Sequence, residues 1–236
     1  MLDETGAPSA RGKRENSLHA ALKAWLAQPG DLIEARLDGW VADILRGEQV
    51  IEVQTGNFSA LRPKLESLLP HYAVHVIYPM AVERWVRRIS SDGSTITRRK
   101  SPKHARIEDI FAEVVYIGRW LAHPRLTLDV LLIHEEVHWL NDGHGSWRRK
   151  GWSVADRTLL NVTGQMRFEN IRDYAALLPD GLPQPFSNRD LAAAAGLRQR
   201  LARKMTYTLR EIDILASAGK RGRTNLFTIQ EDYLVR

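Results

Sequence analysis

The chain has 236 residues, 44% of them hydrophobic, and a formal net charge of +6 at pH 7. This length is enough for one or two domains with buried cores. No apolar run reaches 18 residues and no charged-then-apolar leader is present, so we expect neither a membrane-spanning helix nor a secretory signal. The absence of cysteine excludes a disulfide framework and a thiolate metal site, and it fits a reducing, cytoplasmic setting.

The N-terminal part of the chain is predicted to pass from a tail into a helix. Residues 1–14 are polar and small, which is typical of a disordered tail. Between Asn16 and Gln28 apolar residues recur at helical spacing, and Pro29-Gly30 marks the end of this helix.

Two short turns follow the helix and predict the register of three strands. Asp38-Gly39 is a strong signal for a two-residue hairpin, and Gly47-Glu48 is a second candidate. Counting outward from the turns gives the paired residues. The pairs are Leu37–Trp40, Arg36–Val41, Ala35–Ala42 and Glu34–Asp43, then Arg46–Gln49, Leu45–Val50, Ile44–Ile51 and Asp43–Glu52.

The same register predicts a row of carboxylates. Glu34, Asp43 and Glu52 lie side by side on one face, and Gln54 lies two residues further along it. Opposed like charges destabilise a sheet, so such a row needs a compensating cation. Three oxygen ligands on rigid strands suit Mg²⁺ or Mn²⁺. The alternative is an ordinary solvated face, because a register error of one residue would scatter the acids.

A second helix and a buried strand complete this region. The helix has Ser59 as a candidate N-cap and Pro63 in its first turn, and the strand runs through residues 72–79. The apolar positions of the helix are Phe58, Leu61, Leu65, Leu68 and Leu69. The element order is therefore α-β-β-β-α-β. With an acid on the second strand and acid-x-Gln on the third, residues 15–80 resemble the PD-(D/E)XK nuclease superfamily.

This resemblance implies a metal-dependent phosphodiesterase site. Asp43 and Glu52 match the two motif acids and would hold the metal, which activates a water. Glu34 would assist directly or through water. Gln54 stands at the position of the family lysine, which orients and polarises the attacking water, and it would position the nucleophile. An amide cannot supply the charge of a lysine, although some members carry Gln there.

Two further residues belong to this implied site. Lys64, on the second helix, is the nearest lysine that could replace the missing one. Glu15 stands at the start of the first helix, where some members place an extra acid, but a glutamate there also favours the helix dipole. A catalytically inactive, DNA-binding descendant of the family is the alternative.

Basic residues gather in three spans, which favours a polyanionic partner because each neutralised phosphate releases counterions. We therefore expect DNA as the partner. The spans contain Arg84, Arg87, Arg88, Arg98, Arg99, Lys100, Lys103 and Arg106; Arg148, Arg149 and Lys150; and Arg198–Lys204 with Lys220, Arg221 and Arg223.

The middle of the chain is predicted to contain hairpins and one helix, Ile107–Leu121. It also contains His134-Glu135-Glu-Val-His138, which matches the HExxH pattern of zinc peptidases, and His144 stands where metzincins place a third ligand. The preceding run is β-rich, however. On a strand, His134 and His138 are about 13 Å apart at ~3.3 Å per residue, which is too far for one zinc. We expect these histidines in extended structure and keep a zinc metallopeptidase as the second alternative.

The C-terminal part reads as a helix from Glu169 to Leu178, a boundary at residues 183–185, two further helices and a hairpin. Ser187–Asp190 is a capping box ahead of the second helix, and Arg198–Glu211 forms the third. This order resembles a winged helix-turn-helix domain. The residues expected to contact DNA are Arg198, Arg200, Arg203, Lys204, Lys220, Arg221 and Arg223.

Together these features predict an α+β protein: a PD-(D/E)XK-like αβββαβ core, a middle region rich in β-hairpins and a C-terminal winged helix. The expected boundaries are a tail over 1–14, a nuclease-like domain over 15–165 and a winged helix over 166–236. The two halves together resemble an uncharacterised bacterial family. The function that follows is hydrolysis of DNA phosphodiester bonds with Mg²⁺ or Mn²⁺.

Overall fold

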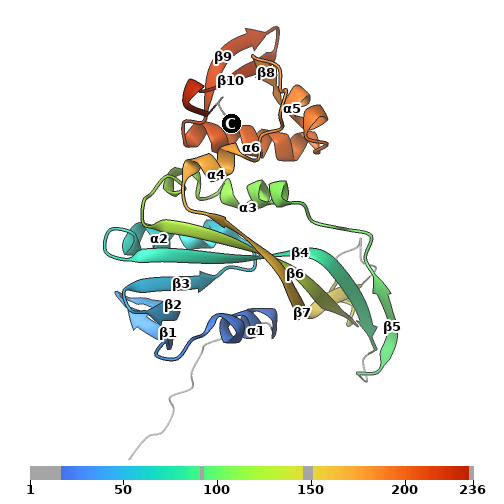
Figure 1. Ribbon diagram of the computed structural model, residues 1–236. Coiled ribbons are helices and arrows are strands. Elements are labelled where there is room, and N and C mark those ends of the chain that lie inside the picture. Colours follow the sequence, from blue (N-terminus) through green and yellow to red (C-terminus); the bar gives the residue numbers. More distant parts are fainter. Residues whose placement is uncertain (1–16, 91–92, 146–150, 234–236) are drawn as a thin grey trace, which may run out of the picture.

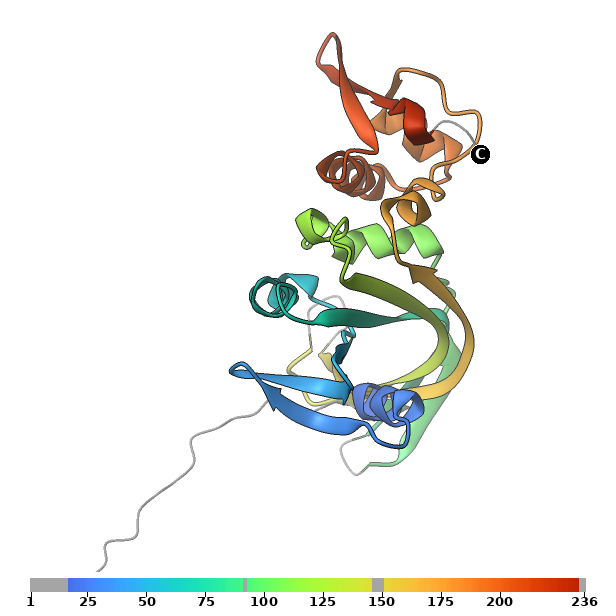
Figure 2. The ribbon, with the colours of Figure 1, turned by 60° about the vertical axis from the view of Figure 1, so that its left-hand side comes forward.

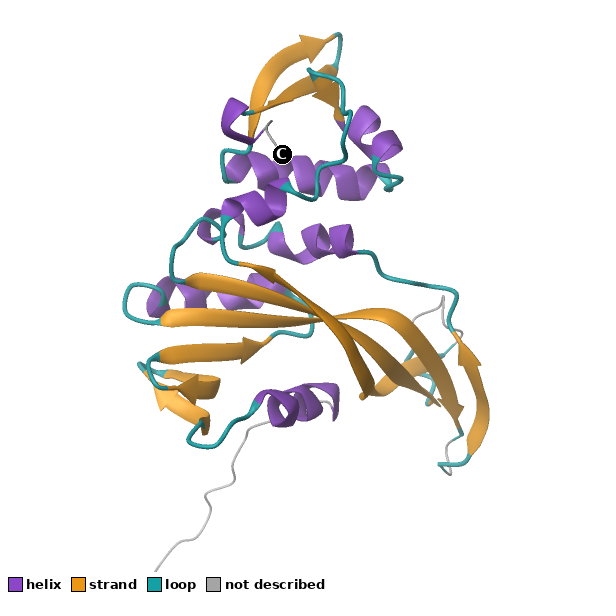
Figure 3. Ribbon diagram, in the orientation of Figure 1, coloured by secondary structure: helices purple, strands orange, loops and turns teal. Residues whose placement is uncertain are grey.

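A computed structural model describes residues 17–90, 93–145 and 151–233 as a mixed α+β chain. Figure 1 shows a large sheet with helix α1 (Ser17–Leu26) on one side and α2 (Arg62–Leu68) and α3 (Phe111–Val114) on the other. A smaller C-terminal unit is stacked beyond α3, and Figure 3 shows that it has a sheet of its own. The tail over 1–14, Glu15 and the cluster at 148–150 lie outside the described residues.

The large sheet has the strand order β1-β2-β3-β4-β6-β7, with β5 also paired to β4. β3 and β4 are parallel, as are β4 and β6, while the other pairs are antiparallel. Figure 2 shows how strongly the long strands curve. The strands are β1 (Leu32–Leu37), β2 (Trp40–Arg46), β3 (Gln49–Val53), β4 (Ala73–Ile89), β5 (Thr95–Lys100), β6 (Leu126–Asn141) and β7 (Trp152–Phe168).

The two predicted hairpin turns are confirmed. Asp38 and Gly39 both have positive φ, 48° and 82°, as a turn that matches the strand twist requires, and Gly47 has φ 58°. The pairs next to the turns follow the predicted register, including Ala35↔Ala42 and Ile44↔Ile51. The predicted element order up to β4 is also confirmed.

Two predictions about local structure are wrong. Residues 107–121 do not form one helix but two short 3₁₀ turns around the single turn of α3, because β-branched residues are frequent there and Gly118 interrupts the run. Asn57 rather than Ser59 precedes the turn that leads into α2, although Pro63 does occupy the first turn of that helix.

The large sheet carries a separate apolar core on each face. On one face Leu18 and Leu22 of α1 pack with Ile44 and Ile51. The core on the other face runs from α2 through α3 into the C-terminal unit, where Met205 is fully buried. Lys204 Nζ also donates to the Ala112 carbonyl at 2.6 Å. The apolar core on this face of the sheet therefore continues into the C-terminal unit.

The C-terminal unit contains α4 (Ile171–Ala175), β8 (Phe186–Ser187), α5 (Asn188–Ala194), α6 (Gln199–Glu211), β9 (Leu215–Arg221) and β10 (Thr224–Ile229). Its sheet has the order β8-β10-β9. The predicted capping box of Ser187 and Asp190 is present. Because β7 continues to Phe168, residues 166–168 belong to the large sheet and not to this unit.

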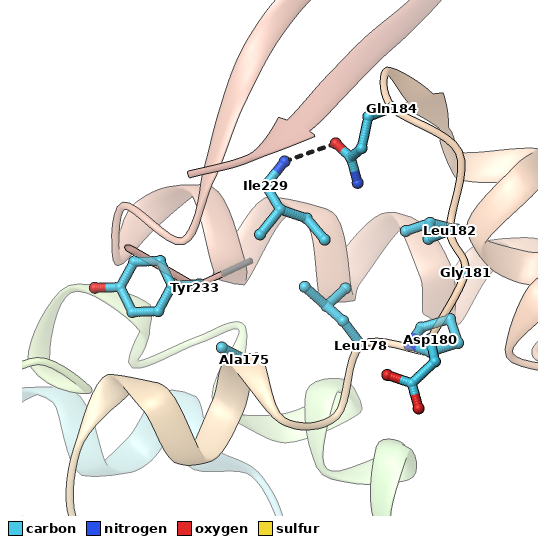
Figure 4. Close-up of a pocket in the computed structure, with 9 residues that line it drawn as sticks. Ala175, Leu178, Asp180, Gly181, Leu182, Gln184, Ile229 and Tyr233 are labelled. Atoms are coloured by element: carbon cyan, nitrogen blue, oxygen red, sulfur yellow. Dashed lines mark hydrogen bonds between the residues drawn. The ribbon is translucent and has the colours of Figure 1, made fainter. Parts of the chain in front are cut away.

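A small pocket of about 180 Å³ lies between α4, the loop after it and β10. Figure 4 shows Leu178, Leu182 and Ile229 around it, and the Gln184 side-chain carbonyl accepting from the Ile229 amide at 3.0 Å. The pocket is smaller than typical ligand sites, so we interpret it as a packing seam. Among the described residues, no helix is long and apolar enough to cross a membrane.

Candidate functional site

The three acids that were predicted to form one row are not brought together. Glu34 has a left-handed backbone, φ 52°, which breaks the alternation of β1. Its carboxylate instead meets Lys23 Nζ of α1 at 2.7 Å and remains largely exposed. The prediction assumed uninterrupted alternation, and a single residue in the left-handed region removes Glu34 from the row.

Asp43 and Glu52 remain a pair, at the point where the backbone pairing of β2 and β3 ends. The last paired residues are Ile44 and Ile51. Beyond them, the Asp43 carboxylate accepts from the Val53 amide at 2.8 Å, and the Glu52 carboxylate accepts from the Asp43 amide at 3.4 Å. The two carboxylates thus bind the backbone groups on which the ladder would otherwise continue.

A positive or protonatable side chain reaches each acid from a different helix. His19 Nε2 on α1 lies 3.1 Å from Asp43 Oδ2. Lys64 Nζ on α2 lies 2.5 Å from Glu52 Oε1 and donates to the Val41 carbonyl at 2.6 Å. The lysine that the sequence offers as a replacement is therefore placed against the second motif acid. We call Asp43, Glu52, His19 and Lys64 the acid cluster.

The surroundings of the two acids drive their pKa values apart. Burial raises the pKa of Asp43, but the hydrogen bond and charge of His19, the Val53 amide and the charge of Lys64 together bring it below 3.8. Burial raises the pKa of Glu52 above 4.5, because the charge and hydrogen bond of Lys64 only partly offset it and the charge of Asp43 adds to it. Asp43 therefore holds its negative charge more firmly than Glu52.

Gln54 does not reach the acid cluster through a hydrogen bond. Its side-chain amide donates to the carbonyls of Gly56 and Asn57, and its backbone amide donates to Ile77. The amide thus organises the loop after β3.

The HExxH histidines lie in extended structure, as predicted. All of residues 134–138 belong to β6, and His144 lies in the turn region that follows it. Glu135 is fully buried between Arg84 and Arg157, and His138 contacts Glu136 at 3.2 Å. Within the described ranges, no three histidine, aspartate or glutamate side chains converge as a metal-binding group. The geometry gives the zinc alternative no support.

A groove of about 700 Å³ crosses the C-terminal unit between the start of α5, α6 and the β9–β10 hairpin. We call it the basic groove, because Arg189, Arg203, Arg221 and Arg223 line it, with Asp190 the acid among its lining residues. Of the other residues predicted to contact DNA, Arg198, Arg200 and Lys220 are exposed but do not line the groove. Lys204 Nζ instead donates to the Ala112 carbonyl of α3 and lies 4.9 Å from the centre of the Tyr116 ring.

Some residues of the acid cluster and of the basic groove were not identified from the sequence. His19 and Lys23 are one helical turn apart, a spacing that sets both on one side of α1 and could have identified them. Arg189 lies inside the capping box of α5, where its role in a groove depends on the distant hairpin.

Comparisons with known proteins place the chain among proteins of unknown function. Residues 16–169 match the family described as “Domain of unknown function (DUF8091)”. The chain is also similar to an uncharacterized protein of Treponema pallidum (strain Nichols), with 35% identity over 216 residues that cover 91% of this chain and 85% of that protein. No solved structure matches the chain.

Proposed function

Since the chain belongs to this family of unknown function, we propose from the site itself that it hydrolyses DNA phosphodiester bonds with a divalent metal ion at the acid cluster. The observation that carries the proposal is the Asp43–Glu52 pair at the end of the β2–β3 ladder, with Lys64 Nζ 2.5 Å from Glu52. Two carboxylates and a lysine are the charged groups that such a reaction uses.

The arrangement of elements supports the same proposal. α1 is followed by the antiparallel strands β1, β2 and β3, then by α2 and by β4 parallel to β3. This is the order on which the resemblance to PD-(D/E)XK nucleases rests. Asp43 and Glu52 occupy the motif positions. Lys64 would supply the positive charge of the family lysine, which Gln54 lacks.

The donor set fits Mg²⁺ or Mn²⁺. Magnesium is usually held by one or two carboxylates together with waters and substrate phosphates. Within the described part of the chain, the hydrogen bonds that the Asp43 carboxylate accepts fall on Oδ2, which leaves Oδ1 for a ligand. Asp43 and Glu52 would hold the ion, which would activate water and stabilise the charge that develops on the phosphate.

Lys64 and His19 would contribute charge without binding the metal. Lys64 favours the ionised form of Glu52 against its burial. A fixed positive charge beside the phosphate also stabilises negative charge in the transition state. His19 favours the ionised form of Asp43.

The C-terminal unit would bind the duplex. Its order of helices and strands, and the sheet order β8-β10-β9, support the winged-helix assignment. The arginines of the basic groove would contact phosphates and so position the DNA without reading its sequence.

A DNA-binding protein that does not cut is the second candidate. The acids are partnered by His19 and Lys64, which partly offset their charge, and the Gln54 amide is engaged in its own loop. These contacts suit a descendant that kept the scaffold and lost the chemistry.

One assay separates the two candidates. Supercoiled plasmid, linear duplex and branched DNA are incubated with the full chain in Mg²⁺, Mn²⁺ or EDTA. We expect metal-dependent cleavage that Asp43→Asn and Glu52→Gln abolish without changing DNA affinity. Glu66→Gln, an exposed acid on α2, is the matched control and should cut normally. DNA binding with no cleavage in either metal would establish the second candidate instead.

A further inference from the structure

Two adjoining hollows lie on the large sheet, away from the basic groove. The first, of about 290 Å³, is lined by Thr55, Tyr78, Lys103 and Glu113 among others. The second, of about 360 Å³, is lined by Val86, Arg99, Trp139 and Val154 among others. Arg84 and Arg157 line both hollows, so the two adjoin, and we call them together the sheet groove.

We propose that the sheet groove binds a single-stranded segment of the DNA whose backbone reaches the acid cluster. The inference rests on the proposed function and specifies its substrate as DNA with an unpaired region. Each hollow has the size of a small-ligand pocket, which suits nucleotides of one strand better than a duplex.

The cations of the groove are the first support. Glu135, fully buried behind the groove, binds Arg84 Nε at 2.5 Å and Arg157 Nη2 at 2.6 Å, which fixes both guanidinium groups while parts of these side chains stay exposed. Among the described residues, none forms a hydrogen bond or ion pair with the side chains of Arg99 or Lys103. Both cations are therefore available to phosphates.

The acids in the lining oppose these cations only in part. The Asp109 carboxylate accepts from the Arg106 amide at 3.0 Å, and the Glu113 carboxylate accepts from the Phe58 amide at 3.1 Å. Both line the first hollow, whereas the second hollow has no acidic residue in its lining. The charge of the groove therefore becomes more positive toward β5.

The apolar wall of the second hollow is the reason to expect an unpaired strand. Strand pairing aligns Arg99, Val86, Val137 and Arg157 in one row across four strands. Trp139 and Val154 are paired in the neighbouring row, and Val154 is 44% exposed. The valines between the two arginines, together with Trp139 in the neighbouring row, suit bases next to the phosphates that the arginines would bind. The faces of the bases are accessible only where the DNA is not paired.

The position of the groove connects it with the acid cluster. Thr55 comes three residues after Glu52, which is about 10 Å along an extended chain. Arg157 Nη1 donates to the Thr55 carbonyl at 3.5 Å and thereby joins β7 to the end of β3. A strand that lies in the groove would thus continue toward Asp43 and Glu52.

Binding of labelled oligonucleotides in EDTA tests this inference independently of cleavage. The probes are a single strand of oligodeoxythymidine about 20 nucleotides long and a duplex of the same length. The groove variant is Arg99→Ala with Lys103→Ala. The control is Arg36→Ala with Lys100→Ala, which removes the same charge from exposed positions outside the groove, Lys100 being the next residue along β5 from Arg99.

We expect the groove variant to bind the single strand about tenfold more weakly than the control does. The slope of log K against log[salt] should be smaller in magnitude by about 1.4, because two phosphate contacts are lost. Its duplex affinity should equal that of the control. Equal single-strand affinity in both variants, equal losses for the single strand and the duplex, or tighter binding of a matched RNA strand would overturn the inference. A wild-type chain that binds the single strand through the groove but cuts no DNA would overturn the proposed function alone.

Discussion

The chain neutralises buried carboxylates in two different ways. On β6, Asp129 accepts from His75 at 2.7 Å, from Gln165 at 2.6 Å and from Nε and Nη2 of Arg167. At the acid cluster, the contacts of the Asp43 and Glu52 carboxylates within the described part of the chain are with the side chains of His19 and Lys64 and with two backbone amides.

This difference separates a structural acid from a candidate ligand-binding acid. Both oxygens of Asp129 are occupied, so a further ligand would have to displace an existing partner. Among the described residues, the hydrogen bonds of the Asp43 carboxylate fall on Oδ2 and leave Oδ1 available to a ligand. Burial alone therefore does not identify a functional acid, whereas a buried carboxylate with an oxygen left available favours one.

Removing Asp129 is expected to give the largest loss of stability. Asp129→Ala leaves the buried His75 without its acceptor and also breaks the contacts with Gln165 and Arg167, so we expect a loss of about 2–3 kcal/mol. Asp43→Asn keeps an acceptor for the Val53 amide, so we expect a loss of only about 1 kcal/mol. Urea denaturation of both variants measures the two losses. Equal losses would remove the distinction between the two kinds of acid.

Lys64 provides the next test. Lys64→Met should lower the rate of metal-dependent cleavage by about 10²-fold, as expected for the loss of a charge beside the transition state, and leave duplex affinity unchanged. Lys64→Arg should recover part of the rate because it restores the charge. Arg62→Met on the same helix is the control. A Lys64→Met chain that cuts at the normal rate would show that this lysine only stabilises the fold around Glu52.

Some of these structural features were predictable from the sequence and others were not. The hairpin register was predictable because Asp38-Gly39 demands a local backbone that only one type of turn satisfies. The direction of the Glu34 side chain was not predictable, because its left-handed backbone conformation accompanies a contact with Lys23 on a separate element. The ion pair between Asp129 and Arg167 joins residues 38 positions apart in the sequence, and no local sequence pattern predicts such a pair.

The basic groove allows a smaller effect to be measured. Arg221→Ala with Arg223→Ala should weaken duplex binding about tenfold and lower its salt slope by about 1.8, because two phosphate contacts are lost. Point variants are preferable to removal of residues 183–236, because Met205 and Phe186 belong to the core shared with the sheet. Unchanged affinity and slope would reassign the C-terminal unit to protein binding.

The pH dependence of stability should differ in sign between the two acids of the cluster. The folded pKa of Asp43 lies below 3.8, so its charge stabilises the fold above that pH and the contribution is lost as pH falls through the folded pKa. Asp43→Asn should therefore be less stable than the wild type at pH 7, and this difference should close below pH 3.8.

Glu52 should behave in the opposite way. Its folded pKa lies above 4.5, so its ionisation opposes folding at pH 7 and this effect fades as pH falls toward 4.5. The stability of Glu52→Gln relative to the wild type should therefore be highest at pH 7 and decline on acidification. Thermal unfolding across this pH range measures both trends, and parallel curves for the two variants would contradict the assigned pKa directions.

Binding of Mn²⁺, followed by electron paramagnetic resonance, tests directly whether Asp43 and Glu52 hold a metal ion. We expect the wild-type chain with DNA to bind Mn²⁺, Asp43→Asn and Glu52→Gln each to abolish this binding, and Glu34→Gln to retain it because Glu34 turns toward Lys23. Undiminished Mn²⁺ binding by the Asp43→Asn and Glu52→Gln variants, or its loss in Glu34→Gln alone, would contradict the assignment of the metal site to the acid cluster.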